Sequence, residues 1–309
     1  MDVSSNSPTS AFGDYAGPPP VLVAASSDRA LDNAAAAVEA AGLRLAPVTI
    51  DEAADRLSIQ AAASALWVEV DSDGGAHLDR LLDRVEAEAA IGRFPAIVAA
   101  PAALIDPISA RIADSNVELL IDPTLADRVA ALALATSSRN RPARVHDVAS
   151  EPSAVRLRQL SDEVSRIAAT LARLSVGPGS PAANRNEAPV KSGAVPAVEI
   201  ETVRQVIRAR RLRARFFDEE LFADPAWDML LDLLQAEIAQ HRVPVSSLCI
   251  AAAVPATTAL RWIKTMMDAG LFKRRADPHD GRRVFIELSR EASDGMRRYF
   301  GEVGRTAVI

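Results

Sequence analysis

The sequence has few of the residues that support disulfide, zinc or aromatic chemistry. Cysteine occurs once in 309 residues, at Cys249, histidine occurs four times, and aromatic residues make up 4% of the chain. A single cysteine cannot form a disulfide within its own chain, and four scattered histidines do not have the ligand spacing of a zinc site. We therefore expect no disulfide, no bound metal and a reducing, cytoplasmic compartment.

Long apolar runs and catalytic motifs are also missing. No uninterrupted apolar stretch approaches the roughly 18 residues of a membrane-spanning helix. GxGxxG, P-loop, GxSxG and HExxH motifs and Cys/His pairs do not occur, so we expect no membrane span, no cofactor and no catalysis. Cys249 lies in the apolar stretch LCIAAA and is expected to be a structural thiol. Residues 1–20 lack the basic and apolar regions of a secretory signal and are interpreted as a disordered leader.

What the chain does contain is an uneven distribution of charge. Its net charge of −6 comes from 35 basic and 41 acidic residues. Residues 1–140 hold nine basic and 20 acidic side chains, a net charge of −11, whereas 141–200 carry +2 and 201–309 carry +3. This asymmetry predicts separate acidic and basic domains, of which the acidic one would be repelled by nucleic-acid phosphates.

Short apolar runs alternate five times with helical patterns between residues 21 and 136. The runs are 21–27, 43–48, 65–71, 94–101 and 117–123, and the helical patterns are 28–41, 51–63, 76–91, 104–115 and 124–135. The runs are rich in Val, Leu and Ile, as buried strands are. Five strand and helix pairs predict an α/β domain with a doubly wound parallel sheet of five strands and right-handed crossovers.

Residues 137–176 are interpreted as a hinge followed by a short amphipathic helix. Apolar residues recur there at steps of three and four, at Leu157, Leu160, Val164, Ile167, Leu171 and Leu174. This spacing is typical of a coiled-coil seam, but a coiled coil this short is only marginally stable on its own. Coiled-coil dimerisation and packing on the first domain therefore both remain open. Residues 177–198 are rich in Gly, Pro, Ser and Ala and predict a flexible linker.

Residues 199–309 show the pattern of a winged helix-turn-helix. An arginine-rich helix opens this part, and we interpret its basic residues as a solvated face. A short helix, the turn 253–255 and a second helix ending at Gly270 follow. Two strands, 272–275 and 283–288, are separated by the turn residues 277–281 and predict a hairpin.

The second helix and the hairpin carry the candidate DNA-binding residues. Ala259, Trp262, Ile263 and Met266 fall on one helix face, which we expect to be buried. The outward residues are then Thr257, Thr258, Arg261, Lys264 and Thr265, and the hairpin adds Arg274, Arg275, His279, Arg282 and Arg283. Hydroxyl and basic side chains on a helix suit the major groove, and arginines at a hairpin tip suit the minor groove or phosphates. An ordinary solvated surface is the alternative for these charges.

The hairpin resembles the wing of MarR-type transcriptional regulators. The sequence Asp277-Pro278-His279-Asp280-Gly281-Arg282, followed by Leu288-Ser289, is similar to that family's D-P-x-D-x-R and L-T pattern, and Ala269-Gly270-Leu271 is similar to the end of its recognition helix. The resemblance covers about residues 220–300. It implies a dimeric, sequence-specific DNA-binding protein whose recognition helix is 256–267. The dimer helices on which the family's small-molecule pocket depends are not identifiable in the sequence.

Residues 21–135 resemble a response-regulator receiver. Asp71 ends the third apolar run, 44 residues after Ser27, as the phosphoacceptor would. Ser26 and Ser27 stand where the receiver has its acidic pair, Ala99-Ala100 replaces its hydroxyl, and Asp122 replaces its lysine. Phosphorylation needs carboxylates for Mg²⁺ and a cation for the phosphoryl group. We therefore expect a degenerate receiver in which Asp71 is a turn residue and is not phosphorylated.

Together these patterns predict a DNA-binding transcriptional regulator. The expected partner is double-stranded DNA, the expected state is a homodimer, and the expected location is the cytoplasm, at the nucleoid when bound. A protein partner for the N-terminal domain is a further expectation. The alternative is a protein-interaction adaptor, because winged helices also serve as docking modules.

Overall fold

The computed structural model describes residues 19–113, 116–137 and 195–306. Nearly all of the expected leader, hinge helix and linker lies outside these residues. The described residues up to 137 and from Pro196 onward belong to one compact unit. The domain boundaries expected from the sequence therefore stay predictions.

The N-terminal part alternates strands with helices. In chain order its elements are β1 (Val21–Ala25), α1 (Asp28–Ala40), β2 (Leu45–Thr49), α2 (Ile50–Ile59), β3 (Ala65–Glu69), α3 (Gly75–Ala90), β4 (Ala96–Ala100), η1 (Ala102–Leu104), α4 (Ile105–Arg111), β5 (Val117–Ile121) and α5 (Leu125–Ser137). The strands lie in the order β2-β1-β3-β4-β5, and every neighbouring pair is parallel. This flavodoxin-like order confirms the predicted five-stranded parallel sheet.

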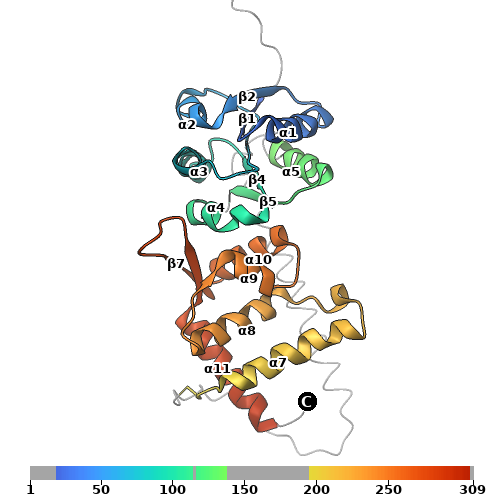
Figure 1. The fold of residues 1–309 in the computed structure, drawn as a ribbon, viewed down its shortest axis with the longest axis vertical. Coiled ribbons are helices and arrows are strands. Elements are labelled where there is room, and N and C mark those ends of the chain that lie inside the picture. The colour runs from blue at the N-terminus through green and yellow to red at the C-terminus, as the bar shows by residue number, and fades with distance from the viewer. Residues whose placement is uncertain (1–18, 114–115, 138–194, 307–309) are drawn as a thin grey trace, which may run out of the picture. The chain divides into compact units, whose positions relative to one another are not determined.

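Alternate residues of the strands build one core on each face of the sheet. Leu22 and Val68 point to the face covered by α2, α3 and α4, whereas Val23 and Trp67 point to the face covered by α1 and α5. Figure 1 shows the two helix layers on either side of the strands. Because both faces are covered, the strands are mostly apolar and do not alternate regularly with polar residues, which is why the runs were visible in the sequence.

A buried ion pair crosses the α5 face of the sheet. Glu69, at the end of β3, accepts hydrogen bonds from the Arg128 guanidinium, with Nη2 2.5 Å from Oε1, and from the Trp67 indole at 2.9 Å. Arg128 also donates to the Pro123 carbonyl at 2.5 Å. The side chains of Glu69 and Arg128 are 4% and 12% exposed. This network ties α5 to the middle of the sheet.

Two predicted helices are shorter in the structure than in the sequence pattern. The 51–63 pattern gives α2, which ends at Ile59, because Gln60 adopts an extended backbone and its side-chain amide donates to the Ala62 carbonyl. The 104–115 pattern gives α4, which ends at Arg111, because Ile112 turns to an extended backbone and is buried. Beyond these two helix ends, Ala63 and Ile112 are apolar and buried.

The C-terminal part contains helices and one small antiparallel sheet. Its elements are α7 (Ile200–Leu212), η2 (Arg213–Arg215), η3 (Glu219–Phe222), α8 (Pro225–Ile238), β6 (Val243–Pro244), α9 (Val245–Ala251), α10 (Ala256–Asp268), β7 (Phe272–Ala276), β8 (Val284–Leu288) and α11 (Arg290–Thr306). The strand order is β6-β8-β7, with antiparallel pairing. Met229, Leu234 and Leu248 are fully buried at the centre of its core.

Helices α9 and α10 form a helix-turn-helix, and β7 and β8 form the hairpin that follows it. The two helix axes differ in direction by 106° across a short break, within the usual range of about 90–120° for this motif. Ala253 in the break has a φ of +53°, and Gly270 closes α10 with a φ of +73°. Two crossing helices followed by an antiparallel hairpin are thus present, in the order that the sequence pattern predicted.

Candidate DNA-binding surface

Helix α10 presents most of its predicted polar residues outward. Arg261 and Thr265 are exposed, and Lys264 is half-buried and pairs with Asp268 at 3.1 Å. Thr257 and Thr258 are half-buried. The expectation that Trp262 is buried was wrong, because the buried face is centred on Ala259, Ile263 and Met266 and Trp262 lies at its border, 37% exposed.

The tip of the wing is held by side-chain to backbone hydrogen bonds. Asp277 Oδ1 accepts from the His279 amide, and Asp280 Oδ1 accepts from the Arg282 amide, both at 2.9 Å. Asp280 also lies 3.4 Å from Arg283 Nε, whose side chain is 63% exposed. These turns hold Arg282 and Arg283 side by side at the tip, with His279 exposed beside them. On the strands of the wing, Arg275 pairs with Glu287 at 3.3 Å.

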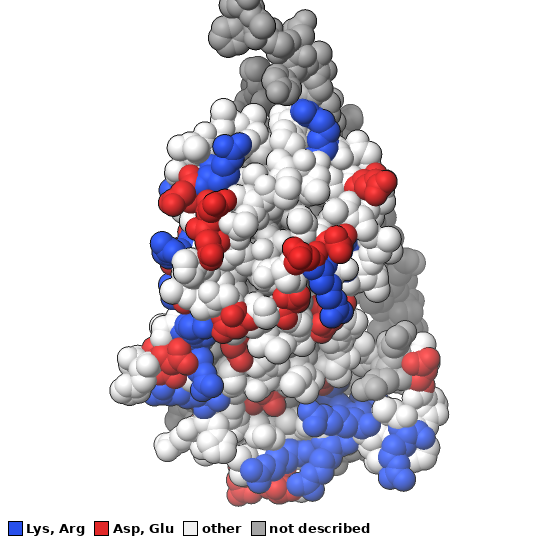
Figure 2. Space-filling model, turned by 45° about the horizontal axis from the view of Figure 1, so that its top comes forward, with Lys and Arg blue, Asp and Glu red and all other residues white. Residues whose placement is uncertain are grey.

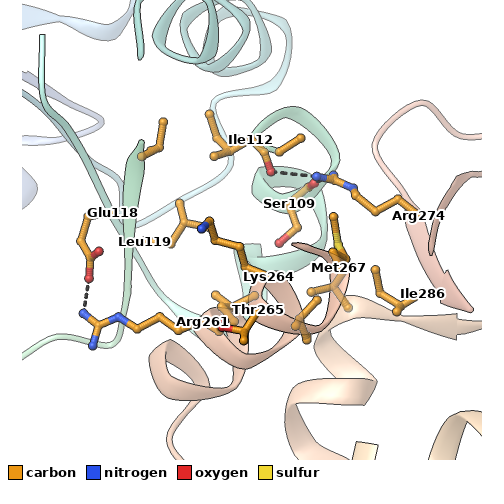
Figure 3. Close-up of a pocket in the computed structure, with 15 residues that line it drawn as sticks. Ser109, Ile112, Glu118, Leu119, Arg261, Lys264, Thr265, Met267, Arg274 and Ile286 are labelled. Atoms are coloured by element: carbon orange, nitrogen blue, oxygen red, sulfur yellow. Dashed lines mark hydrogen bonds and ion pairs between the residues drawn. The ribbon is translucent and has the colours of Figure 1, made fainter. Parts of the chain in front are cut away.

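Two of the predicted α10 residues contact the edge strand of the N-terminal sheet. Thr257 Oγ1 accepts a hydrogen bond of 2.9 Å from the Ile121 amide. Arg261 forms an ion pair with Glu118, which Figure 3 shows as a dashed line. Both partners belong to β5, so the helix expected to read DNA lies along a strand edge.

Arg274 on β7 reaches the carboxyl end of α4. Its guanidinium donates to the Ser109 carbonyl and, at 3.2 Å, to the Ile112 carbonyl. Figure 3 shows Arg274 pointing into this last helical turn. The negative end of a helix favours a cation there. Burial nevertheless lowers the pKa of Arg274, with the charge of Glu86 acting in the opposite direction.

Arg282 at the wing tip contacts two acidic residues of the N-terminal part. Its Nη1 and Nη2 donate to Asp73 at 2.8 and 2.6 Å, and its Nε lies 3.2 Å from Asp79. Hydrogen bonding to Asp73 raises the pKa of Arg282, and the same hydrogen bonds are the main cause that lowers the pKa of Asp73. A two-pronged pair of this kind fixes both position and orientation.

A fourth contact joins α4 to α9. Asp106 accepts from the Ser246 amide at 2.9 Å and from the Ser246 hydroxyl at 2.6 Å. Close by, Ile105 and Ile121 of the N-terminal part pack into the core of the C-terminal part. The contact therefore combines polar bonds with apolar burial.

The contacts of Arg261 with Glu118 and of Arg274 with α4 border a cavity of about 260 Å³. Its wall is apolar at Ile112, Leu119 and Met267 and polar at Lys264 and Arg274 (Figure 3). The Ser109 hydroxyl also lines it, is buried, and has no hydrogen-bond partner in the described part of the chain. Packing between α4, β5 and α10 is thus incomplete.

Asp71 lies just after β3, with serines where a receiver has carboxylates. Ser26 and Ser27 donate to its carboxylate at 2.8 and 2.5 Å, and Ser72 donates at 3.1 Å. The hydrogen bond from Ser27, followed by that from Ser26, lowers the pKa of Asp71. Asp122, at the position of the receiver lysine, has a φ of +47° and accepts from the Ala102 amide. Ser26, Ser27, Asp71 and Asp122 therefore lie at the same end of the sheet. Among the described residues, no cation pairs with Asp71.

The arginine-rich helix α7 carries a charged surface of its own. The exposed arginines are Arg204, Arg208 and Arg211 on α7 and Arg213 and Arg215 on η2, which follows it. Arg210 is half-buried against Asp228 at 2.6 Å. Figure 2 shows basic side chains gathered at the lower end of the view, where Figure 1 places the C-terminal elements. This agrees with the prediction of a solvated basic face.

Three further features bear on other functions. Cys249 is buried, and burial, together with the nearby charge of Asp106, raises its pKa to about 12. Among the described residues, no group of three or more His, Cys, Asp or Glu side chains could hold a metal ion. No single helix in those residues is long and apolar enough to cross a membrane, although α9 and α10 pass this test together as a bent pair, by length and composition only.

The chain matches no protein-family model and no curated protein. Among solved structures, a probable transcriptional regulator from Pseudomonas aeruginosa is 23% identical over 35% of this chain and 78% of its own, with a TM-score of 0.23. MarR is 17% identical over 35% of this chain and 77% of its own, with a TM-score of 0.22. NadR in complex with 4-hydroxyphenylacetate is 19% identical over 35% of this chain and 74% of its own, with a TM-score of 0.21. Identities and TM-scores this low establish neither the family nor the function of this chain.

Sequence reasoning found the basic residues but missed their acidic partners. Asp73, Asp79, Asp106 and Glu118 were counted only in the net charge of the acidic part. That count was taken to mean that the acidic part would be repelled by nucleic-acid phosphates, whereas its charge also predicts attraction to the basic winged helix. The charge asymmetry was the one signal in the sequence that pointed to this contact.

Proposed function

We propose that the chain is a MarR-like, DNA-binding transcriptional regulator that acts as a homodimer. The observation that carries this proposal is the helix pair α9 and α10, which cross at 106° and lead into a basic hairpin. In a helix-turn-helix the second helix enters the major groove. Lys264, Thr265 and Arg283 would then contact DNA from α10 and from the wing tip, where Arg283 would enter the minor groove. The proposal assigns no reaction to the chain and places it in the cytoplasm, at the nucleoid when bound.

A titration with duplex DNA tests this function. The full chain is added to a fluorescently labelled, mixed-sequence duplex of about 30 base pairs at several salt concentrations. Log affinity should fall linearly with log salt, because each phosphate contact releases counterions. Arg283→Ala should flatten the slope by about one or less. Arg208→Ala, on α7, removes the same charge and is the matched control. It should change the slope of log affinity against log salt less than Arg283→Ala does.

Two outcomes would contradict the proposal. One is no binding above background at about 50 mM salt, where electrostatic binding is strong. The other is an Arg283→Ala variant that behaves like the Arg208→Ala control.

Exposed apolar residues after α7 support the homodimer. Phe216, Phe217 and Leu221 are 70%, 59% and 73% exposed, and Phe222 packs edge-on against Phe217 at a ring distance of 5.6 Å. Contiguous apolar side chains on a surface often mark a site of protein–protein interaction, whereas single exposed apolar residues do not. We assign a second copy of the chain to it.

A protein-interaction adaptor is the second candidate function, and one observation favours it. The surface of α10 and the wing contacts a folded protein surface, through Arg261 to Glu118 and Arg282 to Asp73. A surface of this chemistry accepts acidic protein groups as well as phosphates. Retained binding to an acidic protein, with no binding to DNA, would favour the adaptor.

A further inference from the structure

We propose that the N-terminal sheet domain is a built-in competitor of DNA, because it occupies the surface with which the winged helix would read a duplex. In this arrangement the sheet domain must leave α10 and the wing before DNA binds. The inference rests on the proposed DNA-binding function and adds a regulatory contact to it.

The first argument is chemical. Four of the ten candidate DNA-binding residues use groups of the sheet domain as partners, namely Thr257, Arg261, Arg274 and Arg282. Three of these are arginines, whose partners are carboxylate or carbonyl oxygens. Arginine binds carboxylates and phosphates through the same fork of N–H donors. The two-pronged pair of Arg282 with Asp73 therefore fills the donors that a phosphate would use.

The second argument is steric. Thr257 and Arg261 lie on successive turns of one side of α10, and both contact β5. The major groove of B-DNA is about 12 Å wide and admits one helix. A helix that carries a strand edge on its outer side is too broad for that groove. Contact with β5 and entry into DNA are therefore mutually exclusive on this side of α10.

The third argument is electrostatic. Residues 1–140 carry a net charge of −11, and four of their acidic residues lie at the contact: Asp73, Asp79, Asp106 and Glu118. Asp73, Asp79 and Glu118 attract the basic wing and helix at short range, and all four groups would repel a duplex at the same place. DNA and the sheet domain therefore compete for one set of cations.

The contact is built to be reversible. The pairs of Arg261 with Glu118 and of Arg282 with Asp73 remain partly exposed, and such pairs contribute little each and are screened by salt. A cavity of about 260 Å³ remains between the packed elements, and the Ser109 hydroxyl that lines it has no hydrogen-bond partner among the described residues. A core without such defects would hold more firmly. DNA at working concentrations can therefore displace the sheet domain.

Neutralising the acidic side of the contact tests the competition in the full chain. The contact variant is Asp73→Asn with Glu118→Gln, which leaves every candidate DNA-binding residue intact. Both side chains are more than one third exposed, so the neutral replacements preserve the fold. The control variant is Asp32→Asn with Glu39→Gln on the exposed side of α1, which changes the net charge by the same amount.

The contact variant should bind the mixed-sequence duplex about three- to tenfold more tightly than the control variant, because a larger fraction of it is open. In a second measurement, adding DNA to the unmodified chain should speed hydrogen exchange at the Ile121 amide, which loses its Thr257 acceptor. Equal affinities of the contact and control variants, or an Ile121 amide that exchanges no faster with DNA, would overturn the competition while leaving the DNA-binding function in place. If none of the three proteins binds DNA at low salt, the proposed function fails, and this inference fails with it.

Discussion

Arg282 and Asp73, 209 residues apart in the chain, form a two-pronged ion pair with Nη1–Oδ2 and Nη2–Oδ1 distances of 2.8 and 2.6 Å. The pair joins the tip of the wing to the loop that follows β3. Asp71, which the sequence resemblance to a receiver placed at a phosphoacceptor position, lies two residues before Asp73 in the same loop. The state of that loop and the position of the wing are therefore linked by one contact.

Removing the arginine should raise the pKa of Asp73. Hydrogen bonds from Arg282 are the main cause that lowers the pKa of Asp73 below 3.8, so the pair stabilises the fold above that ordinary value and is lost as pH falls through the lowered one. In Arg282→Gln the pKa of Asp73 should rise but stay below 3.8, because the Gly75 amide still donates to it. Carboxyl NMR titration measures this directly. Asp127, whose pKa is lowered by Thr124, is the internal control and should not change.

Arg128→Ala should destabilise the sheet domain strongly. The substitution leaves the carboxylate of Glu69 buried without its cation, which typically costs about 3–5 kcal/mol. The exposed Arg29→Ala should change the free energy of unfolding by less than about 0.5 kcal/mol. Urea denaturation measures both. The double variant Glu69→Gln with Arg128→Met should recover part of the loss, and an Arg128→Ala variant as stable as Arg29→Ala would contradict the role of the pair.

Acetyl phosphate with Mg²⁺ should add no mass to the intact protein. Ser26 and Ser27 offer hydroxyls to Asp71 where Mg²⁺ would need carboxylates. Intact-protein mass spectrometry checks this expectation. A phosphorylated species that disappears in Asp71→Asn would show that the site is active after all.

Phe216→Ser with Leu221→Ser should weaken the proposed dimer. Both side chains are at least 70% exposed, so the change removes apolar surface available to a second copy without opening the monomer core. Sedimentation velocity over a range of protein concentrations should show a shift from dimer to monomer. Ile59→Ser with Ile91→Ser, each 73% exposed on the sheet domain, is the matched control. The assignment of this surface is contradicted if the two double variants sediment alike.

The sequence predicted the elements of both parts well because each has a local signal. The parallel sheet is buried on both faces, so its strands stand out as apolar runs, and Gly270 and the turn residues after Asp277 mark the ends of α10 and β7. Helix ends were less predictable. Ile112 is apolar and follows the helical spacing, yet it leaves α4 to pack beside it.

The candidate site could be predicted only in part, because its contacts join residues far apart in the chain. The outward basic residues of α10 follow from helical periodicity, whereas the pairing of Arg274 with the end of α4 depends on how two folded parts meet. The exposure of Trp262 was also not predictable from helical periodicity, although it depends on packing within one folded part. A position at the border of the buried face is exposed or buried according to what packs against it.

The hydrogen bond from the Ile121 amide to Thr257 has a consequence for how long an open form can last. β5 is the last strand of its sheet, and α10 lies against its free edge. When α10 departs, that edge becomes a template on which a strand from another molecule can pair. Opening in the absence of DNA therefore carries a risk of aggregation, and a rapid return of the helix protects the protein from it.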